Sequence, residues 1–371
     1  MNLYIFNEPS PAAVYGIGTY IKELTTALKD SDINVCVVHL RSEKPDDKTT
    51  ESDDIHHLYF PSPINLNASS NWDRQNELYY RNIVFLLRLQ IKNTENLVFH
   101  LNYNLCETLV EELKKVFDCT IITVAHYSEW GLAVYDNLPR LRSILKEEHP
   151  DDFSKKLKKL FEMEKSLYTK VDRVICLSDY MYDILCVDYE LEKAKISIIA
   201  NGLTDTKKAI SNKKLLRKKW KIPVKEKIIL FVGRIDEIKG VEYLFKAFRE
   251  VLIGYPNSRL VIAGDGAFSK YSKVSQDICA KITYTGFLYK TQLYEWYCLA
   301  DVGVIPSLFE PFGYVAVEMM MHALPVVATE TSGLNEVIDE TCGLKVPVIH
   351  HPDKVEINSN LFVEKSIIFA A

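Results

Sequence analysis

Two cations in the second half of the chain are the clearest candidates for chemistry. Arg234 and Lys239 lie five residues apart in residues 231–240, directly after a run typical of a buried strand and before a predicted helix. Fixed cations and backbone N–H groups at such a position can stabilise the negative charge of a diphosphate without a metal ion. We interpret Arg234 and Lys239 as a phosphate-binding pair; the alternative is a solvated loop with two surface charges.

A second segment, residues 306–318, again follows a predicted strand and opens a helix. Free backbone N–H groups near Gly313 and Tyr314 can hold a phosphate there, and the preceding Phe312 is assigned to the same binding set. Carboxylates accept hydrogen bonds from vicinal hydroxyls, so Glu310 and Glu318 could bind a sugar and a ribose. The alternative is that Glu310 is an N-terminal helix charge and Glu318 an exposed helix residue.

The first half offers two further candidates. Gly16 and Gly18 precede a predicted helix, where the missing β-carbons would let the backbone approach a phosphate or a sugar. His126 ends a predicted strand, and a lone histidine there has a structural role as its alternative. Gly16 and Gly18 do not complete a dinucleotide fingerprint, because position 21 is Ile21 instead of glycine, which argues against a dehydrogenase.

The composition narrows the class of protein. The 371 residues carry a net charge of −5, which argues against a nucleic-acid partner. Eight scattered cysteines are interpreted as reduced core residues of a cytoplasmic protein, and no apolar run reaches the length of a membrane span. Asp30 and Asp32 have the Asp-x-Asp spacing of a metal-dependent glycosyltransferase, but they lie in a predicted helix-to-strand turn. The adjacent histidine pairs at 56–57 and 350–351 are expected in surface loops. No metal site or cofactor is therefore predicted.

Short β-branched runs alternate with segments of helical periodicity, which predicts an α/β fold with parallel sheets. We expect two doubly wound domains, residues 1–203 and 204–371, with the hinge near the lysine-rich segment 207–227. Ligands of such sheets bind at the carboxyl ends of the strands. The expected strands are 2–6, 34–39, 96–100, 120–125, 173–177, 227–232, 259–263, 281–285, 301–305 and 325–329, and the expected helices of the first half are 19–29, 77–89, 106–117 and 153–169.

Four motifs follow one another in the second half of the chain: Gly-Arg-x4-Lys-Gly, Pro-Ser-x2-Glu-x-Phe-Gly-x4-Glu, the run at 325–329 and Gly333-Leu334-x-Glu336. This ordered set resembles glycosyltransferase family 4. The resemblance implies the GT-B fold, two Rossmann-like domains facing across a cleft. It also implies retaining, metal-independent transfer of a sugar from a nucleotide-diphosphate donor, of UDP or GDP type, to a saccharide, lipid-linked glycan or peptide.

The resemblance also assigns roles to residues. It implies that Arg234 and Lys239 bind the donor diphosphate, and that Glu310 and Glu318 contact the transferred sugar and the ribose. It places a glycine-rich, donor-contacting loop at Gly16 and Gly18, and it places His126 near the anomeric carbon. His126 and Glu310 are therefore the expected catalytic residues. The residues expected to bind the donor are Gly16, Gly18, Arg234, Lys239, Phe312, Gly313, Tyr314 and Glu318.

Departures from the family pattern leave an alternative open. Members normally continue into further terminal helices, whereas this sequence stops at Ala371. Loss of those helices could loosen domain closure, so a nucleotide-sugar-binding protein without efficient turnover is the competing hypothesis. Pro311 and Ala323 stand where the family often has glycine. The basic residues 155–159 could contact the inner face of a membrane, although a solvated helix face is the simpler interpretation. The aromatic segment 126–148 is a candidate acceptor loop.

Overall fold

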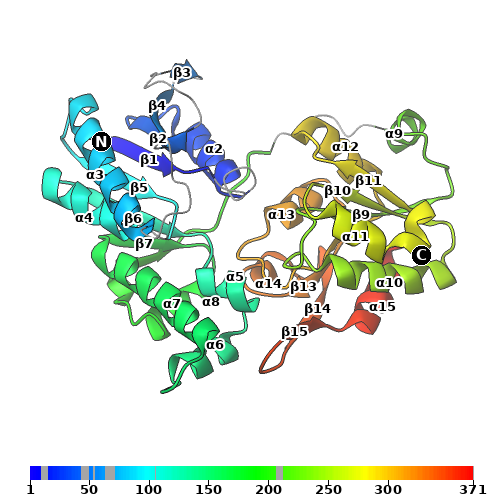
Figure 1. The fold of residues 1–371 in the computed structure, drawn as a ribbon. Helices are drawn as coiled ribbons and strands as arrows, with labels where there is room; N and C mark the ends of the chain where they lie inside the picture. The colour runs from blue at the N-terminus through cyan, green and yellow to red at the C-terminus, as the bar shows by residue number, and fades with distance from the viewer. Residues whose placement is uncertain are drawn as a thin grey trace. The chain divides into compact units, whose positions relative to one another are not determined.

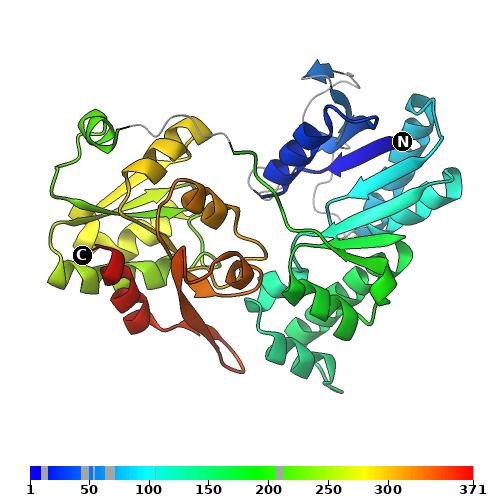
Figure 2. The same cartoon turned by 180° about the vertical axis from the view of Figure 1, so that it is seen from behind.

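The structure is a computed structural model that describes residues 1–9, 16–42, 50–52, 55–62, 72–104, 106–205 and 212–370. It contains two compact units (Figures 1 and 2). One comprises Met1–Glu129 with Asp151–Gly202, and the other comprises Trp130–Pro150 with Leu203–Ala371. Each unit is a largely parallel sheet with helices packed against it, which confirms the predicted α/β class.

The first unit has the strand order β3-β4-β2-β1-β5-β6-β7-β8, and within the described residues only β3 and β4 pair antiparallel. The order reverses direction at β1, which pairs with β2 on one side and β5 on the other. The strands are β1 (Asn2–Asn7), β2 (Asn34–Ser42), β3 (Thr50–Ser52), β4 (Ile55–Pro61), β5 (Leu97–Leu101), β6 (Thr120–Ala125), β7 (Arg173–Cys176) and β8 (Ile196–Ile198). The helices are α2 (Gly16–Leu28), α3 (Trp72–Gln90), α4 (Glu107–Val116), α5 (Glu129–Val134), α6 (Leu138–Leu145), α7 (Asp152–Lys170) and α8 (Asp179–Val187), with α6 and part of α5 counted in the second unit.

The second unit has the order β11-β10-β9-β12-β13-β14-β15, with the described pairs parallel except β14 and β15. Its order reverses at β9, which pairs with β10 and β12. The strands are β9 (Lys227–Val232), β10 (Ser258–Ala263), β11 (Ile282–Gly286), β12 (Val302–Ile305), β13 (Val326–Glu330), β14 (Gly343–His350) and β15 (Val355–Ile357). The helices are α9 (Lys213–Lys219), α10 (Val241–Gly254), α11 (Phe268–Val274), α12 (Lys290–Leu299), α13 (Tyr314–Met321), α14 (Leu334–Val337) and α15 (Ser359–Ala370).

The central strand β9 shows why this sheet is covered on both faces. Its side chains alternate between two cores: Ile229 and Phe231 belong to one apolar cluster, and Ile228 and Leu230 belong to the other. A strand buried on both faces is a continuous apolar run instead of an alternating pattern. That run is why its predicted bounds, 227–232, agree with the structure.

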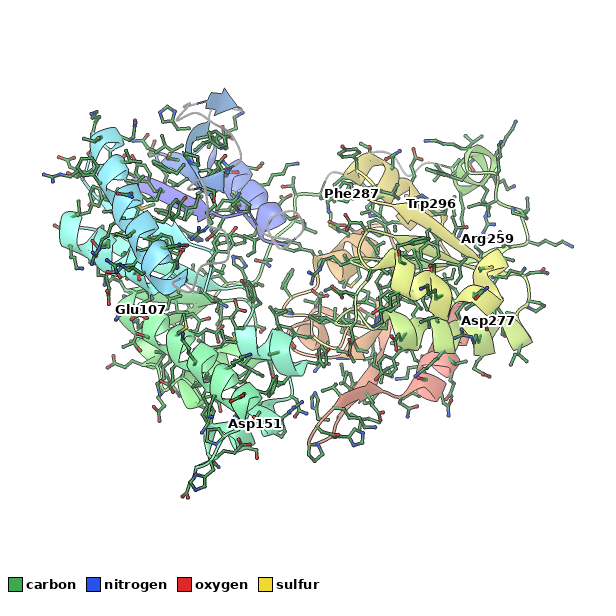
Figure 3. The ribbon with its side chains drawn as sticks, viewed as in Figure 1. Glu107, Asp151, Arg259, Asp277, Phe287 and Trp296 are labelled. Carbon is green, nitrogen blue, oxygen red and sulfur yellow. The ribbon has the colours of Figure 1, made fainter. Side chains whose placement is uncertain are left out.

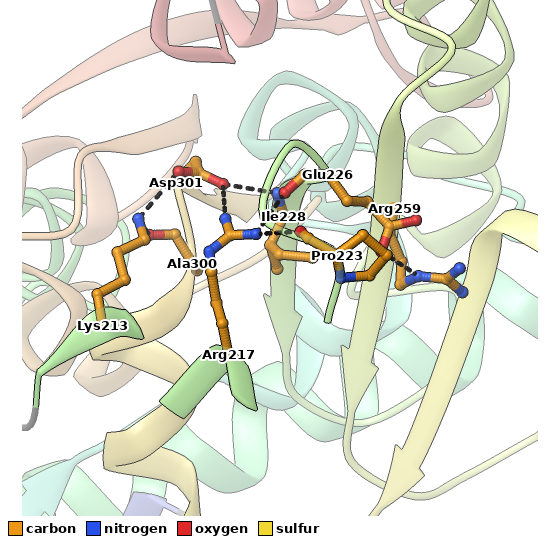
Figure 4. Close-up of polar contacts among 8 residues, drawn as sticks. All are labelled: Lys213, Arg217, Pro223, Glu226, Ile228, Arg259, Ala300 and Asp301. Atoms are coloured by element: carbon orange, nitrogen blue, oxygen red, sulfur yellow. Dashed lines mark hydrogen bonds and ion pairs between the residues drawn. The ribbon is translucent and has the colours of Figure 1, made fainter. Parts of the chain in front are cut away.

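Arg217 attaches the segment that follows the inter-unit connection to the second sheet (Figure 4). Its guanidinium is buried and donates to the carbonyl oxygens of Pro223 and Glu226, both at 2.8 Å. It also reaches the carboxylate of Asp301 at 3.3 Å, and this carboxylate accepts from the backbone N–H of Ile228 at 2.8 Å. Much of the segment expected to form a hinge is therefore structured: α9 lies in the second unit, while residues 206–211 lie outside the described residues.

Trp220 adds an apolar contact at the same place. Its indole packs against Trp296 of α12, with ring centroids 4.9 Å apart; Figure 3 labels Trp296. The predicted domain boundary after residue 203 lies one residue from the boundary between Gly202 and Leu203. Residues 130–150, expected in the first domain, pack instead with the second unit.

Several smaller predictions were wrong. His56 and His57, expected in a surface loop, lie in β4, which pairs with β2 on one side and β3 on the other. The buried, alternating Leu58 and Phe60 of this strand come only after the two histidines. Not all cysteines are core residues: Cys279 is exposed, although all eight are free thiols. Trp130 of the candidate acceptor loop is fully buried, so its ring offers no face to a sugar. In the part of the chain that the structure describes, no helix is both long and apolar enough to cross a membrane.

Candidate functional site

In the first unit, the candidate residues gather where the sheet order reverses, at the carboxyl ends of neighbouring strands. Asn102 follows β5, His126 follows β6, and the two side chains meet at 2.9 Å between His126 Nε2 and Asn102 Oδ1. Tyr20 of α2 lies edge-on against the imidazole, with ring centroids 4.7 Å apart. The structure therefore brings the predicted His126 next to the helix that begins with Gly16.

The His126 imidazole is neutral and has a defined tautomer. The Asn102 amide nitrogen donates to the carbonyl oxygen of Phe6 at 2.9 Å, which turns its oxygen toward His126. His126 Nε2 must then carry the hydrogen and donate it. Burial, and secondarily the nearby His100, lowers the pKa of His126 to about 3. His126 is thus a fixed hydrogen-bonding group that stays uncharged at neutral pH.

Gly16 and Gly18 occupy a different local structure from the one expected. They lie within the first turn of α2, instead of forming a loop that precedes it. The segment before them, residues 10–15, lies outside the described residues. A β-carbon built on Gly16 would meet no heavy atom within 4 Å, so space is open at this helix end.

In the second unit, the predicted charged residues meet at the carboxyl ends of β9 and β12. Lys239 Nζ donates to Glu310 Oε2 at 2.5 Å, and the Ser307 hydroxyl donates to the same oxygen at 3.3 Å. Asp236 accepts from the Lys239 backbone N–H at 3.0 Å and contacts Arg234 Nη2 at 3.2 Å. Each predicted cation therefore has a carboxylate that fixes its side chain or its loop.

The two loops carrying these residues pack backbone against backbone. The Leu308 N–H donates to the carbonyl oxygen of Ile238 at 2.7 Å. Gly240 has φ +66°, and a β-carbon built on it would lie 1.8 Å from Pro306 O. Glycine is needed there both for its backbone conformation and for this close approach. The loop after β9 and the loop after β12 thus pack directly against each other.

The segment around Gly313 starts helix α13. Gly313 has φ +98° at the N-cap, and no side chain caps this helix end. Phe312 is buried, and its ring lies edge-on to Tyr314 with centroids 5.2 Å apart. A helix N-terminus presents backbone N–H groups and a partial positive charge, both suited to an anion.

Glu318 is held by protein donors that the sequence did not reveal. Its side chain is 3% exposed, and its carboxylate accepts from Lys290 Nζ and from the Tyr297 hydroxyl, the latter at 2.8 Å. A ribose would have to share this carboxylate with Lys290. Burial, with the Glu318 carboxylate adding to it, raises the pKa of Tyr297 well above its usual range, so the phenol remains a donor.

Sequence reasoning also missed a third loop of the second unit. Gly264 and Gly266 follow β10, with φ +150° and +136°, and added β-carbons would lie 2.0 Å from Gly233 O and 2.7 Å from Ile235 O. This loop therefore supports the one that carries Arg234. The signal was present as two glycines directly after a buried strand next to β9. Among the described residues, no group of three or more His, Cys, Asp or Glu side chains is arranged to hold a metal ion.

Comparisons with known proteins cover both units. Residues 14–207 match the family model described as Glycosyltransferase Family 4, and residues 226–356 match the model described as Glycosyl transferases group 1. An uncharacterized glycosyltransferase of Methanocaldococcus jannaschii is 36% identical over 176 residues, which are 45% of this chain and 44% of that protein. The chain spans about half the length of the curated relatives it matches.

Solved structures share the architecture along the whole chain. Sucrose-phosphate synthase from Thermosynechococcus elongatus superposes with a TM-score of 0.74 at 21% identity, covering 99% of this chain and 89% of that one. The Anabaena protein HepE in complex with UDP and glucose gives a TM-score of 0.68 at 16% identity, covering 100% of this chain and 92% of its own. The fold is the two-domain, Rossmann-like GT-B fold that the sequence predicted.

Proposed function

Because the chain belongs to glycosyltransferase family 4, we propose that it transfers a sugar from a nucleoside-diphosphate sugar to an acceptor, with retention of anomeric configuration and without a metal ion. One observation carries the proposal: Lys239 and Glu310, on loops that follow the adjacent strands β9 and β12, meet at 2.5 Å, and the loop of Lys239 also carries Arg234. In open α/β sheets, ligands bind at this kind of reversal in strand order.

Arg234 and Lys239 are proposed to neutralise the departing diphosphate. As the sugar leaves, negative charge develops on the β-phosphate, and cations that are already in place stabilise it with little reorganisation. Asp236 pairs with Arg234 and Glu310 pairs with Lys239, and these carboxylates hold the two cations in place. The N–H groups that begin α13 after Gly313 would supply further donors to the phosphates.

Glu310 and Glu318 are proposed to accept hydrogen bonds from the hydroxyl groups of the donor. Glu310 is 18% exposed and uses one oxygen for Lys239 and Ser307, which leaves acceptor capacity for a sugar hydroxyl. Glu318 is more enclosed, so a ribose hydroxyl would join the hydrogen bonds from Lys290 and Tyr297. Carboxylates occupied in this way serve as binding groups, and no covalent glycosyl-enzyme is invoked.

The proposed reaction needs no base of its own from the protein. The bond from the anomeric carbon to the phosphate oxygen breaks, the acceptor oxygen bonds to the same face, and the acceptor proton passes to the leaving β-phosphate. His126, uncharged and fixed by Asn102, would position the sugar by hydrogen bonding. Gly16, around which a β-carbon would meet no heavy atom within 4 Å, would leave room for the donor, and Gly18 would contribute from the same helical turn of α2.

The proposed donors are UDP- or GDP-sugars. One protein of the same fold is described as a complex with UDP and glucose, which supports UDP as the first choice. The proposed acceptors are a saccharide, a lipid-linked glycan or a peptide, and the proposed location is the cytoplasm. A lipid-linked acceptor would require contact with the inner face of a membrane. Flotation with anionic vesicles at low and high salt tests that contact, and absence of binding in both removes it.

A panel of UDP- and GDP-sugars tests the function. A true donor should raise the melting temperature and be consumed when candidate acceptors are present, with or without a chelator. Arg234→Ala and Lys239→Ala should each lower turnover roughly 10²- to 10³-fold, the scale of one lost transition-state donor. Lys246→Ala, on the exposed side of α10, is the matched control and should leave the rate unchanged.

Three results would contradict parts of this proposal. Normal rates in both alanine variants would refute the role of the two cations. Loss of activity with a chelator would refute metal independence, and an inverted anomeric centre in the product, read by NMR, would refute retention. Stabilisation by a nucleotide sugar without consumption across the acceptor panel would favour the competing hypothesis of a nucleotide-sugar-binding protein.

A further inference from the structure

A segment between β6 and α7 is fastened to the second unit by side chains. Within Trp130–Pro150, the Asn137 amide donates to the carbonyl oxygen of His351 at 2.7 Å. Arg140 Nη1 donates to the carbonyl oxygen of Asp353 at 2.9 Å, so α6 is held on the connection between β14 and β15. These contacts join residues more than 200 positions apart, and they fix the turn that precedes α6.

Asp136, in the turn that precedes α6, contacts Ser332 through its side chain. The Ser332 hydroxyl donates to Asp136 Oδ2 at 2.5 Å, and the Asp136 side chain is buried. Tyr135, Asp136 and Ser332 all have left-handed backbones, with φ of 53°, 59° and 42°. Residues with a β-carbon adopt this conformation at an energetic cost, and it persists where surrounding contacts fix it, often at functional sites.

Ser332 belongs to a short turn that holds the loop carrying Glu310. The Thr331 hydroxyl donates to Leu308 O at 2.9 Å, and the Leu334 N–H donates to Glu310 O at 3.2 Å. A β-carbon on Gly333 would lie 2.0 Å from Pro311 O, so the two backbones touch. A displacement of Ser332 is therefore transmitted to the backbone of Glu310 and the residues next to it.

The neighbouring Tyr135 reaches the other donor-site loop. Its ring packs against the core of the second unit, and its hydroxyl hydrogen-bonds to Glu237, which lies between Arg234 and Lys239 in sequence. Burial and this carboxylate raise the pKa of Tyr135 to about 12, so the hydroxyl stays protonated and donates. These two residues thus contact the loop of Arg234 and Lys239 directly, through Tyr135, and the Glu310 loop indirectly, through Ser332.

We propose that Asp136 is a positioning residue of the donor site: through Ser332 it fixes the backbone of the Glu310 loop in the geometry that binds a nucleoside diphosphate. The inference rests on the proposed function. Asp136 itself contacts no reacting atom, so its loss should weaken nucleotide binding by loosening the loop. It assigns a donor-binding role to a chain segment that the sequence pattern suggested for the acceptor.

The experiment is a double-mutant cycle on nucleotide affinity. Binding of UDP and GDP is measured by titration calorimetry for the wild type, Asp136→Ala, Ser332→Ala and the double variant. Each single variant should bind roughly tenfold more weakly, and the double variant should be no weaker than either, because both remove the same contact. Asp136→Asn keeps an acceptor for Ser332 and should restore most of the affinity.

Arg140→Ala is the matched control, because it loosens the same segment at Asp353 without touching Ser332. A merely structural role for the segment would weaken binding equally in this variant, and that result overturns the inference. So does wild-type affinity in Asp136→Ala. A wild type that binds neither UDP nor GDP refutes the proposed function and the inference with it, so the two failures are distinct.

Discussion

Replacing Glu164 by Gln is predicted to stabilise the first unit at alkaline pH. Glu164 lies fully buried in α7, where one carboxylate oxygen accepts from Asn104 Nδ2 at 3.0 Å and the Glu129 N–H at 2.8 Å. The other oxygen contacts the Tyr189 hydroxyl at 2.5 Å. These three partners are neutral groups, and burial raises the pKa of Glu164 to about 8 despite them.

The sign of the effect follows from proton binding. In the unfolded chain the carboxyl group ionises near 4.5, whereas in the folded protein it keeps its proton until about pH 8. The folded state therefore binds one more proton between these values, and the free energy of unfolding falls by about 1.4 kcal/mol per pH unit. Across the window the loss is at most about 5 kcal/mol, and it is complete above pH 8.

Glutamine reproduces the protonated side chain without the ability to ionise. Its oxygen can accept from Asn104 and Glu129, and its amide can donate to the Tyr189 oxygen. We expect Glu164→Gln and the wild type to have similar stability at pH 5. At pH 8.5 the variant should be more stable by about 2–5 kcal/mol, the lower figure allowing for relaxation around the charged form.

Urea unfolding followed by circular dichroism at pH 5, 6.5 and 8.5 measures the difference. Glu162→Gln, on an exposed position of the same helix, is the matched control and should leave the pH dependence unchanged. Parallel pH profiles for Glu164→Gln and the wild type would refute the reasoning, because they would mean that Glu164 gains no proton on folding.

Two other predictions concern the candidate site. Gly240→Ala should lower the free energy of unfolding by roughly 2–4 kcal/mol and weaken nucleotide binding, because its β-carbon would lie 1.8 Å from Pro306 O at φ +66°. Gly254→Ala is the control: a β-carbon there meets no atom within 4 Å, so its melting temperature should be close to that of the wild type. Equal melting temperatures would contradict this. His126 should remain neutral and protonated at Nε2 down to about pH 4, as its pKa of about 3 requires, and nitrogen chemical shifts of the labelled imidazole would show a charged ring at pH 6 if this is wrong.

Local patterns identified most of the framework. The apolar runs at β6 and β9 have no polar alternation because both faces of these strands are covered, and their predicted bounds agree with the structure. Strand β4, which lies between β3 and β2, escaped detection because His56 and His57 precede its two buried apolar residues, Leu58 and Phe60. Gly16 was placed before α2 instead of within it, because helix ends are the least certain feature of a periodic pattern.

Pairing of side chains required the folded chain. The sequence assigned Lys239 to the diphosphate and Glu310 to the transferred sugar, and the structure adds that the two side chains contact each other at 2.5 Å. Nothing in the sequence around Glu318 indicates that Lys290 and Tyr297 hold its carboxylate, since these donors come from another helix.

The sequence by itself determined the two α/β units, the cations after β9 and the acids around α13, because each is encoded within a few neighbouring residues. Only the tertiary structure decided that Asp136 meets Ser332, 196 residues away, and that Trp130–Pro150 packs with the second unit. A contact between distant segments depends on how whole elements pack, and no local periodicity or spacing records which partner a buried polar side chain will find.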